Sequence, residues 1–229
     1  SSSEVIGVKE NSNGRTGVVW VRSTATDQHG RTAIDWARWV MVRKRDESAP
    51  APEAVVPDLA SFVEPADLIV PDGLDLTAYD AVAAGSPFRF DDYEVGEKID
   101  HVDGVTLSEA EHMMATRLWQ NTAKVHFNTE ARDDGRRLIY GGHVISMARA
   151  LSFNGLANAF HIAAINGGRH VAPLFAGGTV FAWSEILETA ELPGRSDVGA
   201  LRIMTRATRD LPCTEFPVED GAPDRPGVI

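Results

Sequence analysis

The feature that most constrains the fold of this chain is an internal repeat. SEVIGVKENSNGRTGVVWVRSTAT begins at Ser3, and SEILETAELPGRSDVGALRIMTRAT begins at Ser184. Each copy runs from Ser-Glu through two aliphatic residues and a later Glu to Gly-Arg, and then ends in an alternating run and Ala-Thr. Two copies of one pattern within 229 residues indicate two copies of one structural unit.

The first copy overlaps a predicted pair of antiparallel strands. Residues 17–26 and 32–43 are rich in β-branched and aromatic side chains, and DQHGR lies between them. Gly30 can take the positive φ that a hairpin loop needs. The second copy overlaps two further predicted strands, at residues 179–188 and 198–208.

Residues 46–87 separate the two copies and differ from both in composition. They hold six of the twelve prolines, which block strand ladders and helix interiors. We therefore expect an extended linker over residues 46–87, the closing strands of a first copy over residues 1–45, and a second domain over residues 88–229. Our hypothesis is a tandem duplication whose first copy lacks its leading strands and helix. The alternative is that two hairpins with glycine turns resemble each other by chance.

The second domain is predicted to start with a strand, a turn and a strand over residues 88–107, followed by two helices. Ser108 and Glu111 form a capping box at the start of the first helix. The apolar stripe expected on this helix consists of Ala110, Met113, Met114 and Leu118, and His112 is expected at the surface. The second helix, over residues 139–160, is predicted to be buried on all sides. An antiparallel sheet wrapped around a buried helix gives the α+β class.

Composition excludes several classes of function. The net charge of −11 argues against nucleic acid and anionic membranes as partners. The single Cys213 cannot form an internal disulfide or a cysteine zinc site, which favours a reducing, cytoplasmic location. There is no uncharged run of eighteen apolar residues and no signal-peptide pattern. The seven histidines lack HExxH spacing, so we expect no metal.

Three stretches carry a resemblance to a known family. WQNTAKVHFN, LIYGGHVISMARAL and GRHVAPLFAGGTVFAWSEI resemble the MaoC-like hydratase family of hot-dog proteins, and the resemblance extends over nearly the whole chain. It implies a tandem (double) hot-dog fold with a truncated first copy. It also implies an acyl-CoA thioester substrate, no cofactor and a hydro-lyase activity. Sheet edges left open by the truncated copy would favour a homo-oligomer.

The family motif is an Asp followed after four residues by a His. His126 falls on the His position, whereas Asn121 occupies the Asp position. An amide cannot take up a proton, so His126 would have to act as the base, and Asn121 would orient the water or the thioester. The alternative is that His126 is a structural histidine in an inactive half-site.

The resemblance places a further role on the paired glycines that open the second helix. The N–H of Gly142 would stabilise the enolate oxygen of the thioester, with Gly141 beside it. The alternative role of these glycines is a tight turn. His143 is a weaker candidate for substrate contact, and Lys124 and Arg169 are candidate partners for a carboxylate or phosphate.

The function implied is reversible hydration of a branched enoyl-CoA, namely mesaconyl-CoA to β-methylmalyl-CoA. Two alternatives stay open at this point. One is hydration of an enoyl-CoA with a different, straight acyl chain. The other is a structural, non-catalytic hot-dog half, which Asn121 in the Asp position favours.

Overall fold

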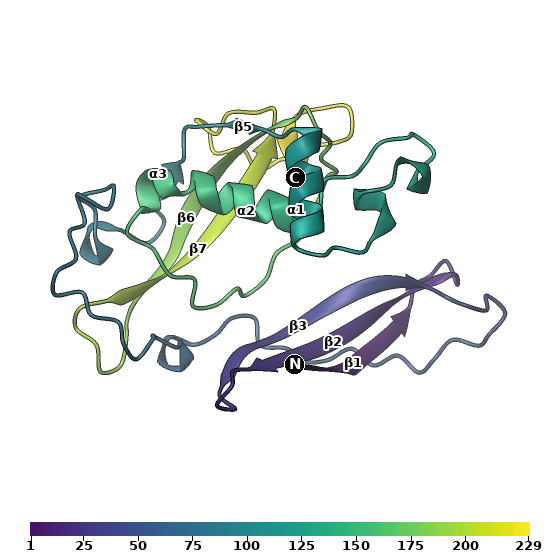
Figure 1. The fold of residues 1–229 in the computed structure, drawn as a ribbon, viewed down its shortest axis with the longest axis horizontal. Helices are drawn as coiled ribbons and strands as arrows, with labels where there is room; N and C mark the ends of the chain where they lie inside the picture. Colours follow the sequence, from purple (N-terminus) through teal and green to yellow (C-terminus); the bar gives the residue numbers. More distant parts are fainter. The chain divides into compact units, whose positions relative to one another are not determined.

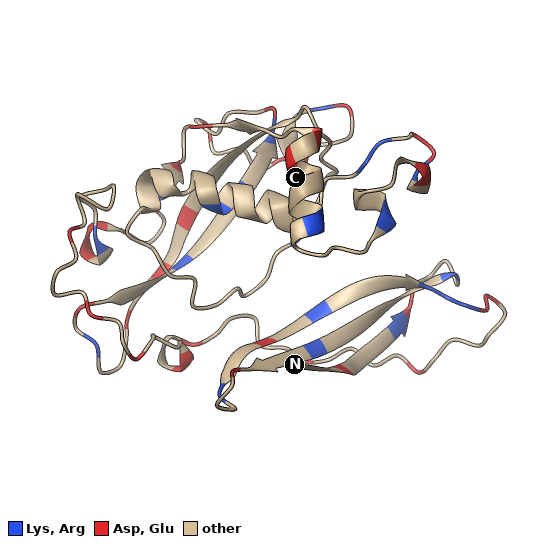
Figure 2. Cartoon of the chain, in the orientation of Figure 1, with Lys and Arg blue, Asp and Glu red and all other residues tan.

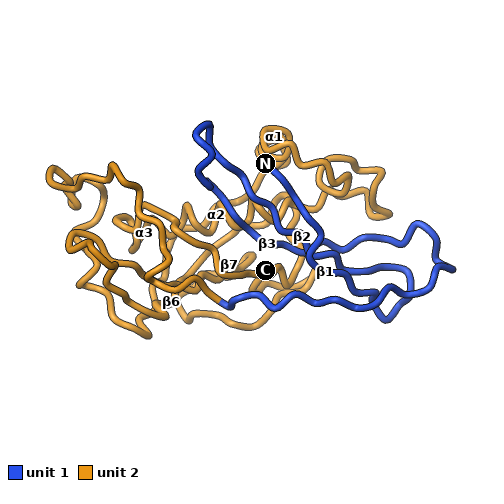
Figure 3. The backbone as a smooth tube through the Cα atoms, turned by 90° about the horizontal axis from the view of Figure 1, so that it is seen from below, with its two compact units in different colours: residues 1–61 blue, residues 62–229 orange.

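The computed structural model describes residues 1–229, and the chain divides into two compact units (Figure 3). Unit 1 is Ser1–Ser61 and unit 2 is Phe62–Ile229, so the division falls inside the predicted linker. Both units are built on antiparallel strands, and all α-helices belong to unit 2. The predicted α+β class is confirmed. None of these helices combines the length and the apolar character needed to cross a bilayer.

Unit 1 is a three-stranded antiparallel sheet in the order β1-β2-β3 (Figure 1). Its strands are β1 (Ser2–Glu10), β2 (Thr16–Thr26) and β3 (Thr32–Arg43). The strands predicted at residues 17–26 and 32–43 are therefore confirmed. The hairpin turn between them has Gly30 at a φ of +80°, which is the conformation that favours glycine.

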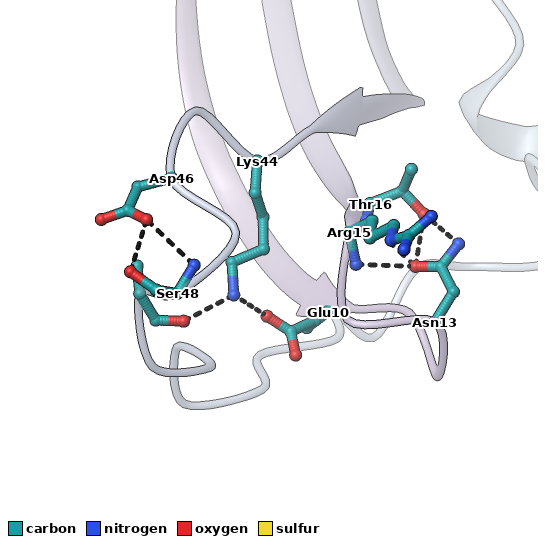
Figure 4. A network of polar contacts seen from close by, with 8 residues as sticks. Glu10, Asn13, Arg15, Thr16, Lys44, Asp46 and Ser48 are labelled. Atoms are coloured by element: carbon teal, nitrogen blue, oxygen red, sulfur yellow. Dashed lines mark hydrogen bonds and ion pairs between the residues drawn. The ribbon is translucent and has the colours of Figure 1, made fainter.

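A network of polar contacts ties the β1–β2 turn and the end of β3 to the chain that follows (Figure 4). The ammonium of Lys44 donates to Glu10 at 2.7 Å and to the carbonyl of Ala49 at 2.6 Å. Further along, Val8 and Val55 exchange backbone hydrogen bonds at 2.8 Å in both directions. The first part of the predicted linker is thus held against β1.

Unit 2 contains a five-stranded antiparallel sheet, in which β4, β6, β7 and β8 follow one another and β5 also pairs with β6. The strands are β4 (Lys98–Asp100), β5 (Val105–Thr106), β6 (Thr179–Glu191), β7 (Gly199–Arg209) and β8 (Gly227–Val228). The long strands predicted at residues 179–188 and 198–208 are confirmed as β6 and β7.

The predicted strand-turn-strand over residues 88–107 is only partly correct. Its first half is the 3-10 helix η2 (Phe90–Asp92), and only the short strands β4 and β5 follow. The Asp92 carboxylate stabilises η2, because it accepts the Arg89 N–H at 2.7 Å. The other 3-10 helices are η1 (Pro65–Asp67), η3 (Lys124–His126) and η4 (Thr129–Ala131).

The central helix α2 (Gly141–Leu151) lies across β6 and β7, where it closes the core of unit 2 (Figure 1). Val144 and Ala148 pack there in one cluster with Val180, Ala182 and Ala207. The sheet therefore covers one face of α2.

The predictions that this helix is buried on all sides and continues to residue 160 are both wrong. On the face turned away from the sheet, Ile145 is 55% exposed. A kink ends the regular helix, because Asn154 has non-helical angles and Gly155 has a φ of +97°. The short helix α3 (Phe153–Leu156) spans this kink.

The first helix, α1 (Glu109–Leu118), begins at the predicted capping box. Ser108 Oγ accepts the Glu111 N–H at 3.1 Å, and the Glu111 carboxylate accepts the Ser108 N–H at 3.4 Å. The predicted apolar stripe is wrong as a buried face, because Met114 is 70% and Leu118 73% exposed. The buried residues of α1 are His112, Ala115 and Thr116.

Candidate functional site

The candidate site lies where the loop after α1 reaches the start of α2. His126 ends η3, and the backbone of Leu138 holds this turn in two places. The Leu138 N–H donates to the Val125 carbonyl at 3.0 Å, and the Leu138 carbonyl lies 2.8 Å from Nδ1 of His126. Because a carbonyl can only accept, Nδ1 carries the proton. In the neutral ring, Nε2 is then the basic nitrogen.

Asn121 sets the path of the chain toward His126. Its side-chain Oδ1 accepts the N–H of Ala123 at 2.9 Å, which is an Asx turn. An aspartate could make the same turn, so this hydrogen bond does not require an amide. The amide adds a hydrogen-bond donor that an aspartate would not have.

The start of α2 presents backbone donors without partners. Tyr140 is its N-cap residue, and the Tyr140 side chain does not cap the helix. The His143 N–H donates to the Tyr140 carbonyl at 2.9 Å, whereas no group of the protein accepts from the N–H of Gly141 or Gly142. Two free N–H groups at the positive end of a helix dipole favour a negatively charged oxygen.

The ring of Tyr140 links this helix start to His126. Its centroid is 5.7 Å from that of the His126 imidazole. A Cβ placed on Gly142 would come within 2.5 Å of the same Tyr140 ring. Glycine at position 142 therefore makes room for the aromatic ring. The structure thus brings together the predicted residues His126 and Gly142, with Tyr140 against both.

His112 belongs to the same cluster, and its predicted surface position is wrong. It is fully buried, and its Nε2 accepts the backbone N–H of Tyr140 at 2.9 Å. Burial and, to a smaller extent, the nearby His126 and His143 lower the pKa of His112 to about 4. The imidazole is therefore neutral near pH 7.

Sequence reasoning missed the roles of His112 and Tyr140. A signal for His112 was present, because His112, Ala115 and Thr116 recur at helical spacing on the side of α1 opposite the Met residues. The apolar stripe is the stronger pattern, and it predicts a different face as buried.

His143 lies in the same cluster, between α1 and α2. It is 3% exposed, and its Nε2 lies 3.5 Å from the nearer carboxylate oxygen of Glu111. Its ring centroid is 5.9 Å from that of Trp119. Neither ring nitrogen of His143 has a hydrogen-bond partner in the protein.

The predicted cationic residues are both exposed. Lys124 opens the 3-10 turn that His126 ends, so it lies near the site along the chain. Arg169 precedes His170, whose ring lies against Gly141. The loop that carries His126 also bears further arginines (Figure 2). Two of these are paired with carboxylates, namely Arg132 with Asp134 and Arg137 with Glu109.

Two further observations concern the side chain of Arg136 and the possibility of a metal site. Arg136 is stacked on Phe175, with its guanidinium carbon 3.7 Å from the ring centroid. No group of three or more His, Cys, Asp or Glu side chains is arranged to hold a metal ion.

Comparison with known proteins gives two curated relatives of high identity. The chain is 58% identical over 223 residues to a protein of Chloroflexus aurantiacus named β-methylmalyl-CoA dehydratase, with 96% of the chain aligned. It is 63% identical over 205 residues to a protein of Cereibacter sphaeroides named mesaconyl-CoA hydratase, with 89% of the chain aligned. The chain covers less than two thirds of each relative, 63% and 59% respectively. No family model matches the chain.

Two solved structures are similar over nearly the full chain. A MaoC domain protein dehydratase of Chloroflexus aurantiacus matches with a TM-score of 0.92 and 57% identity, over 99% of this chain and 66% of that one. A protein of Mycobacterium tuberculosis described as having a double hot-dog fold matches with a TM-score of 0.69 and 25% identity. That match covers 99% of this chain and 65% of the other.

Proposed function

Because this chain belongs to the MaoC-like hydratase family of hot-dog proteins, we propose that it takes part in the reversible hydration of mesaconyl-CoA to β-methylmalyl-CoA. The observation that carries the proposal is the identity of 58% and 63% to two relatives whose names give the two directions of this reaction. Such a protein is a hydro-lyase, and its partner is an acyl-CoA thioester.

In this proposal His126 is the catalytic base. Its Nδ1–H is held by the Leu138 carbonyl, so Nε2 can accept a proton from water. The hydroxyl oxygen then bonds to C3 of the enoyl group, and the electron pair of the double bond moves toward the thioester oxygen. The proton returns to C2, which completes the addition of water.

Gly142 is proposed to stabilise the charge that develops in this step. Its free N–H lies at the start of α2, and an oxyanion accepts from such a donor more strongly than a neutral carbonyl does. Donors of this kind contribute roughly 3 kcal/mol each in comparable sites. Gly141 offers a second free N–H at the same end of the helix.

The remaining residues are proposed to position the substrate. Asn121 would donate its amide N–H to the attacking water or the thioester. Lys124 and Arg169 are exposed cations suited to the free carboxylate and the phosphates of the substrate. His143 would form a buried wall of the site beside Trp119.

One alternative function is supported by a specific residue. Asn121 replaces the acidic member of the family motif, which favours a structural role for this half and a working site elsewhere in a double hot-dog protein. The other alternative is a substrate with a different acyl chain. The reason is that Lys124 and Arg169 are assigned to the substrate carboxylate on their exposure and charge alone.

The organisation of the chain and its assembly are proposals as well. We propose that residues 1–45 correspond to the closing strands of a first hot-dog, with a linker at 46–87 and a second hot-dog at 88–229. We also propose a homo-oligomer, because β3 leaves Trp39 57% and Met41 64% exposed. Light scattering would test this, and a monomer at micromolar concentration would contradict it.

The test of the activity uses the full-length protein and a panel of enoyl-CoAs, with loss of the enoyl absorbance as readout. His126→Ala should lower kcat about 10²- to 10⁴-fold, because the base is lost. His161→Ala removes an exposed histidine and is the matched control. Asn121→Asp keeps the Asx turn and should retain the fold. Turnover that is indifferent to both His126 and Asn121 would support the structural alternative.

A further inference from the structure

The central helix lacks a side-chain cap at its start. A Ser, Asp or Asn at the N-cap would accept one of the N–H groups in the first turn. Tyr140 at this position makes no such bond, and the N–H groups of Gly141 and Gly142 stay free. A conventional cap would occupy the space in front of the donors that the proposed reaction needs.

The backbone at the start of α2 is instead held from α1. The N–H of Tyr140 donates to Nε2 of His112 at 2.9 Å, and His112 is fully buried. The next residue back is held as well, because the Ile139 N–H donates to the Leu174 carbonyl at 2.9 Å. His112 thus satisfies a backbone donor just outside the helix and leaves the first two helical amides unpaired.

We propose that His112 is a positioning residue for the reaction, a role that rests on the proposed function. Its neutral ring, with the proton on Nδ1, fixes Tyr140 and thereby the direction of the Gly142 N–H. The ring of Tyr140 also lies against the His126 imidazole. His112 therefore orients the Gly142 N–H, which is the donor for the thioester oxygen. It also orients the Tyr140 ring, which lies beside the catalytic base.

The bond from the Tyr140 N–H requires the neutral ring of His112, whose buried Nδ1 has no hydrogen-bond partner in the protein. An imidazolium has two donors and no acceptor, so it could not accept the Tyr140 N–H. The rings of His126 and His143 lie 6.5 and 6.4 Å from that of His112, centroid to centroid. The nearby charges of Glu109 and Arg137 act in opposite directions on the protonation of His112.

Three variants of the full-length protein separate positioning from simple packing. His112→Gln keeps a side-chain acceptor, and His112→Met fills a similar volume without a comparable one. Thr116→Val alters the same buried face of α1, where the Thr116 hydroxyl has no partner, and serves as the control. Hydrogen exchange at the Tyr140 amide reports the hydrogen bond, and steady-state kinetics report its effect.

We expect exchange at Tyr140 to rise at least about tenfold in the Met variant and to stay near wild type in the Gln and Val variants. We expect kcat to fall about 10- to 100-fold in the Met variant with KM changed less than about threefold, and the Gln variant to recover most of kcat. Equal exchange in the Met and Gln variants would overturn the proposal. The proposal would also be overturned if the Tyr140 amide of the Met variant exchanged freely while its kcat stayed at the wild-type value.

A measurement on the wild type guards against a Met variant that does not fold. Nitrogen-15 spectra of the imidazole should show the proton of His112 on Nδ1 at pH 7, and a proton on Nε2 would overturn the inference. The two proposals fail separately. Absence of turnover with any enoyl-CoA refutes the proposed function, whereas the tautomer and the amide exchange decide whether His112 holds Tyr140.

Discussion

Ile6 and Leu187 are each the extra residue of a β-bulge, and they occupy the same place in the two copies of the repeat. Ile6 lies three residues after Ser3, and Leu187 lies three residues after Ser184. The pairing of β1 with β2 shifts register across Ile6, and the pairing of β6 with β7 shifts across Leu187. A bulge adds twist at a defined point of a hairpin. Its recurrence therefore supports the duplication hypothesis better than the similarity of the two sequence stretches does.

The bulge in β1 leads to a first prediction. The next residue is Gly7, and a Cβ at this position would come within 2.6 Å of Pro57 and of the Val55 carbonyl. Gly7→Val should therefore lower the free energy of unfolding of unit 1 by about 1–3 kcal/mol, because the backbone cannot move aside at low cost. Urea unfolding measures the change. Gly73→Ala, where a Cβ meets nothing within 4 Å, is the control, and equal effects would contradict the explanation.

A second prediction concerns pH and stability. The pKa of His112 is about 4 in the folded chain and about 6.5 when the chain is unfolded, so the unfolded state binds this proton more tightly. The contribution of neutral His112 is fully present above about pH 6.5, is lost as the pH falls toward 4, and does not change further below that. The loss is at most about 3 kcal/mol.

This pH dependence can be isolated by difference. Burial also lowers the pKa of His101, so wild type and variants share a further slope in the same direction. Urea unfolding at a series of pH values should show a shallower slope for His112→Gln than for wild type. Parallel curves would mean that His112 titrates alike in both states.

The outcome for α1 shows which parts of the site could be predicted. Ser108 and Glu111 are three residues apart, and their capping box is a local interaction that the sequence alone specifies. The bond from Tyr140 to His112 joins residues 28 positions apart, and no local pattern encodes it. The buried face of α1 does have a local signal in the spacing of His112, Ala115 and Thr116, but the apolar stripe is stronger, and the partner of His112 lies in another element.

The predictions for the glycines of the second helix were likewise only partly correct. Gly141 and Gly142 open α2 as expected, at the start of the apolar run that predicts the helix. The helix predicted over residues 139–160 includes Gly155, whereas the positive φ of Gly155 interrupts the regular turns. A packing contact fixes it there, since a Cβ at Gly155 would come within 2.5 Å of Ile99 in β4. That contact is known only from the fold.

A third prediction concerns the only cysteine. Cys213 is 1% exposed, and burial raises the pKa of its thiol, with a smaller opposing effect from the Thr208 hydroxyl. The folded protein should therefore react with a water-soluble aromatic disulfide at least about a hundredfold more slowly than the urea-unfolded protein. Absorbance of the released thiolate measures both rates. Comparable rates would show that the thiol is accessible in the folded state.

The last prediction tests the contact between Tyr140 and Gly142. A methyl group at position 142 would come within 2.5 Å of the Tyr140 ring, so Gly142→Ala must displace that ring, the helix start or both. Because the ring also contacts His126, the variant should lower kcat at least about tenfold with a smaller effect on KM. Gly168→Ala, where a Cβ meets nothing within 4 Å, should leave both parameters within about twofold. If the two variants have the same kcat, the ring and the helix start do not depend on each other, and Gly142 serves only as a turn.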